Sequence, residues 1–408
     1  MVMTSANRSD APVLIDNEAA LQALDGIADS FLLHDRRIAN RCDASLVRCV
    51  DGRAYFLRRS RGYAPAPLMM HAACSGILAL GAHEKGSFAL GKGHHALLSP
   101  YIGNMENWET MQHYRHTLQT YVRLFDVRPK LAVCDLHPDY ASTQLARSLD
   151  LPLLQVQHHH AHIASVLGEN ELHGPVIGIA LDGTGYGTDG TIWGGEILIA
   201  TRRDFKRFWH LPSFALPGGA AAILNPERTA YALLKAYGER DDAFFGQFAL
   251  DNPQFAPFLE HLENRTLLDQ MIDKGLNTPM CSSAGRLFDA VSALLGICAH
   301  PGYDGEAACL LEASAWRGCE GGHPLTARTF HEGLAGAIIE QTVRARSETG
   351  IKDIALSGGC MVNRILSSQL RERLRNLGFE VHVNRNLPPN DGCISYGQAI
   401  VAHARLEE

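Results

Sequence analysis

Four histidines stand close together in the segment VQHHHAHIASV, at positions 158, 159, 160 and 162. The segment follows the apolar, strand-like run LPLLQV, and its pattern predicts a helix that ends at Gly168. On a helix, His158 and His162 are one turn apart, so both imidazoles project from one face, as metal binding from a single helix requires. Polar histidines at a solvated helix end would have the same spacing. A third ligand is needed to decide between a metal site and a solvated helix end. The roles of His159 and His160 stay open.

Two aspartates are candidates for that third ligand. Asp182 ends the apolar strand VIGIALD, and Asp391 lies in the loop PPNDG before the last helix. α/β folds place their sites at the carboxyl ends of strands, although a single aspartate there is more often a turn residue or a helix cap. Two histidines with one or two aspartates would suit Fe(II) or Zn(II), with a position left open for substrate.

Two glycine-rich segments, DGTGYGTDG and SGGCMVN, each follow an apolar strand. Glycine lets backbone N–H groups approach a phosphate, and the N-terminus of a following helix favours the anion. Taken singly, the first also fits a hairpin turn and the second a tight strand–helix turn, and neither matches the P-loop or the dinucleotide fingerprint. Together they predict a nucleotide held in a cleft between two lobes.

Basic side chains suggest further contacts. Eight arginines lie between Arg36 and Arg61, against Asp43 and Asp51. This stretch is either a solvated basic face or a groove for phosphate or a nucleotide. Lys85, in GAHEKGSF, could neutralise a phosphate, although most lysines are simply solvated. Arg286 and Asp289 are three residues apart on an expected helix, which fits an ordinary ion pair.

Composition limits the class of protein. The chain has 408 residues, enough for two or three domains, and its formal net charge of −7 argues against a general binder of nucleic acid or membrane surfaces. No apolar run is long enough to span a bilayer, and the start lacks the pattern of a secretory signal. The ten cysteines form no C-x-x-C pair, which argues against zinc fingers and fits the reducing cytoplasm.

The order of expected elements favours an α/β fold. Strand-like pieces flank a turn at Asp51–Gly52, as in a hairpin, and Pro65–Pro67 marks a boundary. Beyond it, strands alternate with helices. We expect a first segment over residues 1–67, one lobe over 68–178 and a second lobe over 179–408.

Five motifs occur in a specific order: VQHHHAH, ALDGTGYGTDG, SSAGRLFDAV, SGGCMVNR and PPNDG. In this order they resemble the HypF carbamoyltransferases of NiFe-hydrogenase maturation, over roughly residues 70–408. TSAN at 4–7 and LRRSRGYAP at 57–65 are similar to the end of the YrdC-like domain of that family. The resemblance implies a two-lobed actin/hexokinase-like domain with ribonuclease-H-like lobes, preceded by a partial YrdC-like α/β segment. The related tRNA threonylcarbamoyl transferases and antibiotic O-carbamoyltransferases fit this domain order less well.

The resemblance also implies site residues. The catalytic and metal-binding positions would be His158, His162 and Asp391, with Asp182 as a fourth contact to Fe(II) or Zn(II). The nucleotide-binding positions would be Asp182, Gly183, Thr184, Gly185, Asp289, Gly358, Gly359 and Asn363. The sequence departs from the family at Cys393, where glycine is usual, at Tyr396, where leucine is common, and at Asn104, where aspartate is usual.

The implied reaction moves a carbamoyl group from carbamoyl-adenylate, made from ATP and carbamoyl phosphate, to the C-terminal cysteine of the partner HypE. It would serve the synthesis of the cyanide ligands of the hydrogenase. Because the YrdC-like segment is partial, we expect this chain not to form the adenylate itself. Alternatives are an antibiotic-type O-carbamoyltransferase, a sugar-kinase-like phosphotransferase, and an inactive remnant that binds only nucleotide or partner.

Overall fold

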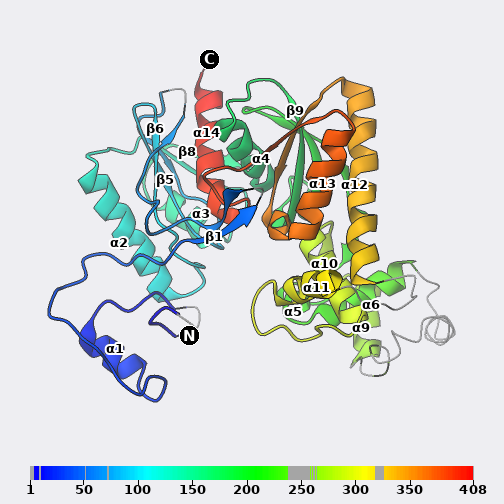
Figure 1. Cartoon of the computed structure of the whole chain (residues 1–408), viewed down its shortest axis with the longest axis horizontal. Coiled ribbons are helices and arrows are strands. Elements are labelled where there is room, and N and C mark those ends of the chain that lie inside the picture. Colours follow the sequence, from blue (N-terminus) through cyan, green and yellow to red (C-terminus); the bar gives the residue numbers. More distant parts are fainter. Residues whose placement is uncertain are drawn as a thin grey trace. The chain divides into compact units, whose positions relative to one another are not determined.

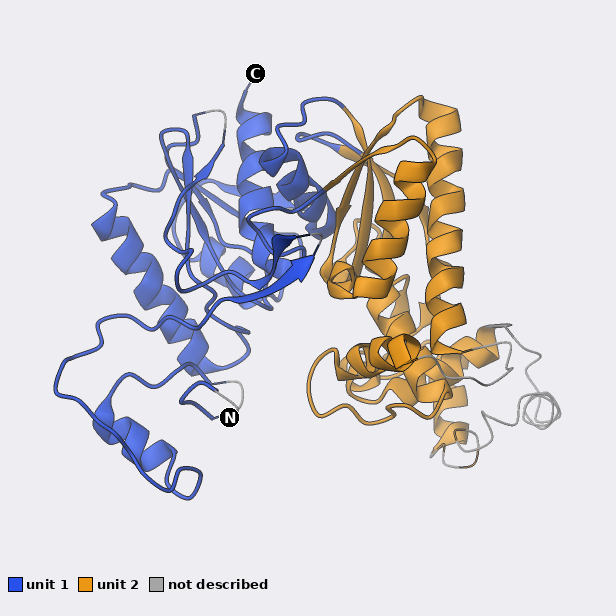
Figure 2. Ribbon diagram, in the orientation of Figure 1, with its two compact units in different colours: residues 1–174, 200–204, 383–408 blue, residues 175–199, 205–382 orange. Residues whose placement is uncertain are grey.

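The computed structural model describes residues 4–8, 11–50, 52–70, 73–237, 258, 260, 262, 264–317 and 326–407. The chain forms two compact units (Figure 2): unit 1 comprises residues 1–174, 200–204 and 383–408, and unit 2 comprises residues 175–199 and 205–382. The expected ranges 1–67, 68–178 and 179–408 are continuous, whereas these units are not. They differ most at the C-terminus, which belongs with unit 1.

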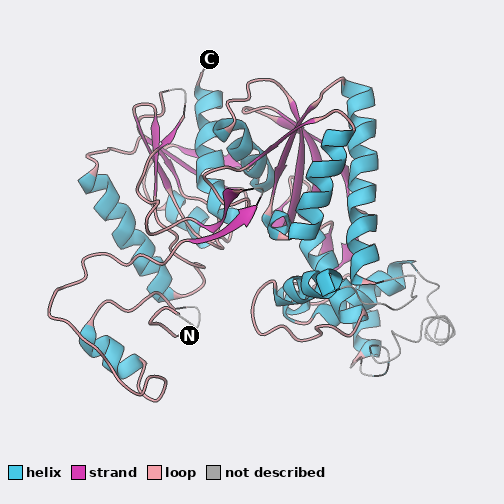
Figure 3. Cartoon of the chain, viewed as in Figure 1, coloured by secondary structure: helices cyan, strands magenta, loops and turns pink. Residues whose placement is uncertain are grey.

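Unit 1 is built on one mixed sheet (Figures 1 and 3) in the order β3-β6-β5-β4-β7-β8. The pairs β4–β7 and β7–β8 are parallel, and the remaining pairs are antiparallel. The elements are α1 (Asn17–Ala23), β1 (Leu46–Val50), β2 (Arg53–Arg58), β3 (Leu68–Met69), β4 (Ile77–Ala79), β5 (Ala89–Lys92), β6 (His95–Leu98), α2 (Trp108–Leu124), β7 (Leu131–Asp135), α3 (Ala141–Arg147), β8 (Leu153–Val156), α4 (His158–Glu169), η3 (Asp391–Cys393) and α14 (Ile394–Leu406).

Alternation along the strands gives this sheet two apolar faces. Ile77 and Ala79 of β4 pack in a cluster with residues of α4 and α14. Leu78 and Leu80 pack in another cluster, with residues of α2 and α3. Because successive strand side chains point to opposite faces, a sheet with apolar residues at consecutive positions must be covered on both sides. The helix that carries the histidines is therefore part of a buried layer.

Helix α4 lies directly against α14. A Cβ added at Gly397 of α14 would overlap the backbone carbonyl of Ala161 in α4, and one at Gly168 of α4 would lie 2.7 Å from Ile400 Cδ1. The expected helix end at Gly168 is wrong, because the helix continues to Glu169 and is capped by Asn170. Gly168 serves close helix packing instead.

The N-terminal hairpin is present. β1 and β2 pair antiparallel, with Val50 opposite Arg53. Asp51, half of the expected turn, lies outside the described residues.

Unit 2 holds a second sheet in the order β12-β13-β10-β9-β14-β15, with β11 paired to β10. β9 and β14 are parallel neighbours. The elements are β9 (Val176–Tyr186), β10 (Ile192–Ala200), β11 (Phe205–His210), β12 (Phe214–Ala215), α5 (Ala220–Leu224), α6 (Pro226–Tyr237), α9 (Arg265–Lys274), β13 (Met280–Cys281), α10 (Ala284–Leu294), α11 (Glu306–Arg317), α12 (Ala327–Thr349), β14 (Asp353–Ser357), η2 (Gly359–Val362), α13 (Arg364–Asn376) and β15 (Glu380–Val383).

One expectation about unit 2 is corrected. Asp182 was expected to end its strand, but β9 runs on to Tyr186, so Asp182, Gly183, Thr184 and Gly185 are strand residues. Helix α10 packs closely against this part of the strand at Gly285. A Cβ on Gly285 would lie only 2.8 Å from Gly183 Cα. Helix α6 ends at Tyr237, and residue 238 lies outside the described part of the chain. Within that part, no helix has the length and apolar character needed to cross a membrane.

Candidate functional site

Three of the predicted ligands come together in unit 1. His158 and His162 lie one turn apart on α4, and Asp391 lies in η3, just before α14. The Nε2 atoms of both histidines are 3.7 Å from Asp391 Oδ1, too far for hydrogen bonds. Ligand atoms of one tetrahedral ion with bonds of about 2.0 Å lie about 3.3 Å apart. The two imidazoles and the carboxylate therefore fit around one divalent ion such as Fe(II) or Zn(II).

The burial of α4 rules out the solvated-helix alternative. His158, His159, His160 and His162 are all buried, and the side chains of His158 and His162 have no exposed surface. Asp391 keeps a small exposed fraction, 13% of its side chain. Burying polar rings costs free energy unless they find partners. A bound ion would satisfy the Nε2 atoms of His158 and His162 together.

Asp135 is a site residue that the sequence reasoning missed. It ends β7, and it pairs in register with Val156 of the parallel strand β8, two residues before His158. Its Oδ2 atom is 2.8 Å from His158 Nδ1, and neither side chain is exposed. In a neutral His158 ring with its proton on Nδ1, the carboxylate would accept that N–H and Nε2 would keep the lone pair that a metal needs. The available signal was a carboxylate at the end of a buried strand, KLAVCD.

Other polar contacts hold α4 in place. Cys393 Sγ lies 3.3 Å from His162 Nδ1, so the side chain that departs from the family contacts a candidate ligand. His160 Nε2 lies 2.8 Å from the carbonyl of Thr201, and burial lowers the pKa of His160 to about 4. The side chain of Gln157 caps α4 by accepting the backbone N–H of His160. His160 is thus a neutral, inward-facing residue whose Nε2–H can donate to that carbonyl.

A ring stack lies where β4 and β7 end, at the carboxyl edge of the sheet. The rings of His137 and Tyr140 are 4.1 Å apart and nearly parallel, and His83 stacks on Tyr140 at 5.2 Å. Burial lowers the pKa of both histidines. Backbone N–H groups of Ala141 and Asp139 donate to the Nδ1 atoms of His83 and His137, so the ring protons of both lie on Nε2. The stack thus supplies neutral N–H donors.

In unit 2, the structure brings Asp182 together with Gly358 and Gly359. Asp182 is buried, and its Oδ1 accepts the backbone N–H of Gly359 at 2.8 Å. Gly358 has φ +103°, and a Cβ there would overlap the Leu181 carbonyl, so only glycine fits. Ser283 Oγ donates to the carbonyls of Asp182 and Gly183. Two glycine segments far apart in sequence are therefore joined, while the role of Asp182 as a metal ligand stays a prediction.

Asp289 and Asn363 make structural contacts. Arg286 Nε donates to Asp289 Oδ2 at 2.8 Å, the ion pair expected from their spacing, while burial raises the pKa of Asp289. Asn363 caps α13 by accepting the N–H of Leu366, and its Nδ2 faces His331 Nε2 at 2.9 Å. The nucleotide-binding roles of Gly183, Thr184, Gly185, Asp289, Gly358, Gly359 and Asn363 remain predictions.

Family models cover almost the whole chain. Residues 72–169 match "HypF Kae1-like domain", and residues 178–325 and 320–398 match "Carbamoyltransferase, Kae1-like Domain, second subdomain". Residues 1–60 match the Sua5/YciO/YrdC model, described as "Telomere recombination". These matches support the actin/hexokinase-like lobes and the YrdC-like segment that the motifs implied.

Individual relatives agree. The chain is 36% identical to the carbamoyltransferase HypF of Rhizobium leguminosarum bv. viciae, over all of this chain and 56% of that protein. It is 33% identical to a carbamoyltransferase HypF homolog of Cupriavidus necator, over 80% of this chain and 91% of that protein. Full-length HypF in a phosphate- and nucleotide-bound form superposes with a TM-score of 0.89 at 38% identity, over 99% of this chain and 67% of that one. The chain spans about half the length of most curated relatives it matches. It belongs to the HypF carbamoyltransferase family.

Proposed function

We propose that the chain is a carbamoyltransferase that moves a carbamoyl group from carbamoyl-adenylate to the C-terminal cysteine of a HypE-like acceptor protein. The observation that carries this proposal is the cluster of His158 and His162, both buried, with the partly exposed Asp391, backed by Asp135. The curated relatives named as carbamoyltransferases support the reaction class. The acceptor and the link to cyanide-ligand synthesis rest on the family resemblance.

Each residue of the site has a separate proposed role. A divalent ion held by His158, His162 and Asp391, with Asp182 as a proposed fourth ligand, would supply a Lewis acid for the carbamoyl oxygen. Asp135 holds the His158 ring in the tautomer that leaves Nε2 available. We assign the adenylate phosphate to the neighbourhood of the glycine segments at 183–185 and 358–359, where the lack of side chains lets a ligand approach the backbone closely. The nucleotide-bound HypF relative supports nucleotide binding.

The transfer step conserves atoms and charge. The acceptor thiol gives its proton to solvent, and the thiolate sulfur forms a bond to the carbamoyl carbon. The bond between that carbon and the phosphate oxygen of the adenylate breaks, and AMP leaves with the electron pair. The product is a thiocarbamate on the acceptor. Holding both reactants together converts a bimolecular step into an effectively unimolecular one.

The test is transfer from synthetic carbamoyl-adenylate to the acceptor protein or to a peptide with its C-terminal cysteine. Mass spectrometry should find one added carbamoyl group on the cysteine sulfur and an equal amount of AMP. Supplying the adenylate directly isolates the transfer step from adenylate formation. AMP release without a carbamoylated acceptor, or transfer to a hydroxyl acceptor alone, would contradict the proposal.

A further inference from the structure

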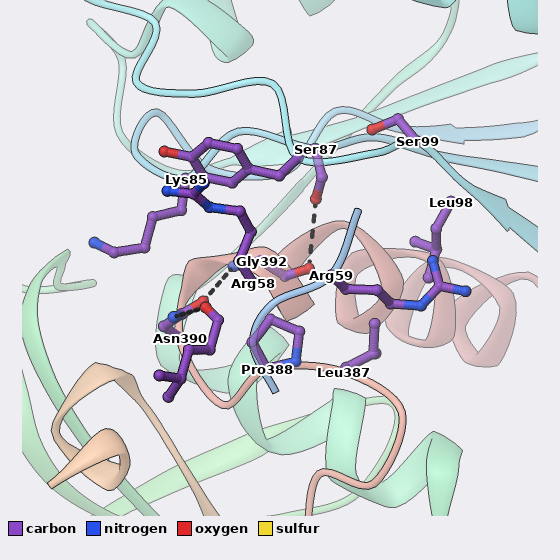
Figure 4. Close-up of a pocket in the computed structure, with 12 residues that line it drawn as sticks. Arg58, Arg59, Lys85, Ser87, Leu98, Ser99, Leu387, Pro388, Asn390 and Gly392 are labelled. Atoms are coloured by element: carbon purple, nitrogen blue, oxygen red, sulfur yellow. Dashed lines mark hydrogen bonds between the residues drawn. The ribbon is translucent and has the colours of Figure 1, made fainter. Parts of the chain in front are cut away.

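A small cavity lies beside the segment that carries Asp391 (Figure 4). Asn390 and Gly392, the two neighbours of Asp391, line it, together with the end of β2 and the loop after β4. Asn390 Nδ2 donates to the carbonyl of Leu57 at 3.0 Å, and Ser87 Oγ donates to the carbonyl of Gly392. The YrdC-like segment is therefore hydrogen-bonded to the segment that supplies a candidate metal ligand.

The cavity is cationic. Among the described residues that line it, Arg58, Arg59 and Lys85 are basic and none is acidic. Asp43, whose charge Arg58 and Arg61 stabilise, is not among the lining residues. Lys85 is paired with Glu84 at 3.3 Å and Arg58 interacts with Asp43, so the positive potential that would attract an anion comes mainly from the two guanidinium groups at the lining.

The two arginines are held in different ways. The guanidinium of Arg58 lies 4.3 Å from the centre of the Tyr101 ring, a cation–π contact that orients it. In Figure 4, Arg58 and Lys85 lie on the side of Asn390, whereas Arg59 extends the other way, between Leu98 and Leu387. Arg59 is only 8% exposed, and its Nη2 donates to the carbonyls of Tyr63 and Ala66.

Arg59 also has an unused donor. Its Nη1 is buried and has no hydrogen-bond partner within the described part of the chain. A buried charged donor left unsatisfied is costly. Burial lowers the pKa of this guanidinium, as expected for a cation removed from water. An oxyanion within reach of Nη1 would satisfy this donor.

The size of the cavity limits the ligand. Its volume of about 20 Å³ has room for roughly one water-sized group. That space suits an oxygen of a planar carboxylate better than a nucleotide. Arginine also matches a carboxylate in geometry, because its planar fork can donate two parallel hydrogen bonds. The Lys85 side chain is 34% exposed and is ion-paired with Glu84, so this side of the lining is in contact with solvent.

We propose that this cavity is a carboxylate subsite, and that in the reaction it takes the terminal carboxylate of the acceptor's last residue. The inference rests on the proposed function, in which the attacking thiol belongs to a C-terminal cysteine. In such a residue the thiol and the carboxylate are on one amino acid. A subsite beside Asp391 would therefore place the sulfur near the candidate metal centre.

The test compares two peptides that end in the acceptor cysteine, one with a free carboxylate and one with a C-terminal amide. Titration calorimetry with the full chain should give at least tenfold tighter binding of the acid peptide. Arg58→Gln and Lys85→Gln should remove this preference, and Arg58→Lys should restore part of it. The matched control is Arg53→Gln, an exposed arginine of the same strand, which should keep the preference. Thermal melts check that each variant is folded.

Three results would overturn the subsite. These are equal binding of both peptides to the wild type, an acid preference that survives Arg58→Gln and Lys85→Gln, and displacement of the acid peptide by inorganic phosphate but not by acetate. The transfer assay separates this proposal from the proposed function. Equal transfer to both peptides would remove the subsite and keep the function. Preferential acid-peptide binding without any transfer would keep the subsite and remove the function.

Discussion

The carboxylate of Asp135 lies 2.8 Å from the Nδ1 atom of His158, with both side chains fully buried. Asp135 ends β7 and His158 begins α4, so the contact joins two elements separated by α3 and β8. A carboxylate behind a metal-binding histidine fixes its tautomer and orientation. Asp135 is therefore a positioning residue for the candidate metal centre.

Removing this contact should weaken metal binding without removing a ligand. Asp135→Ala should lower the affinity for Fe(II) or Zn(II) about 10- to 100-fold, as is typical of lost second-layer hydrogen bonds. The measurement is metal content after equilibrium dialysis against a competing chelator. Asp139→Asn is the control, because Asp139 is exposed on the following loop and should not matter. Equal metal affinity in Asp135→Ala and wild type would contradict the assignment.

The contact between α4 and α14 should tolerate no side chain at Gly397. Gly397→Ala places a methyl group on the Ala161 carbonyl, so we expect a loss of about 3 kcal/mol or more in the free energy of unfolding. Gly333→Ala in α12 meets no atom within 4 Å and should raise stability by roughly 0.5–1 kcal/mol. Urea unfolding compares the two. A Gly397→Ala variant as stable as wild type would show that the helices are not packed this closely.

Nucleotide binding by the glycine segment of unit 2 should require glycine at position 358. Both Gly358→Ala and Gly350→Ala strain a backbone with positive φ, but only the first would overlap another group, the Leu181 carbonyl. We expect Gly358→Ala to weaken AMP binding at least tenfold and Gly350→Ala to leave it unchanged. Fluorescence competition with a labelled nucleotide measures both. Equal affinities would separate the segment from nucleotide binding.

His113 should make the protein acid-sensitive. Burial lowers its pKa from 6.5 to about 4, so the unfolded chain takes up a proton before the folded one does. A depressed folded-state pKa gives stability that is present above pH 6.5 and lost as the pH falls toward 4. The loss should be on the order of 3 kcal/mol, and His113→Leu should flatten it in metal-free protein. The control is His173→Leu, at an exposed position away from His113, which should keep the wild-type slope.

Local patterns predicted much of the site. The spacing of His158 and His162 and the apolar strand before them predicted the helix and the shared face of the two imidazoles, and the motif order supplied Asp391. Asp135 was missed because its role depends on the register between β7 and β8, which places it beside Val156. The close contact at Gly397 depends on which helices meet, and the sequence pattern does not contain that information. β9 continues past Asp182 and its glycines to Tyr186. Pairing with neighbouring strands outweighs the local preference of these residues for a turn.

The central claim is that a metal ion held by His158, His162 and Asp391 supports carbamoyl transfer. The most direct test measures bound metal and transfer from synthetic carbamoyl-adenylate in the same samples, for wild type, His158→Ala, His162→Ala and the control His173→Ala. Wild type and the control should transfer in proportion to bound metal, and the two ligand variants should lose both metal and transfer. Full transfer by a metal-free sample, or unchanged metal in His158→Ala and His162→Ala, would contradict the account.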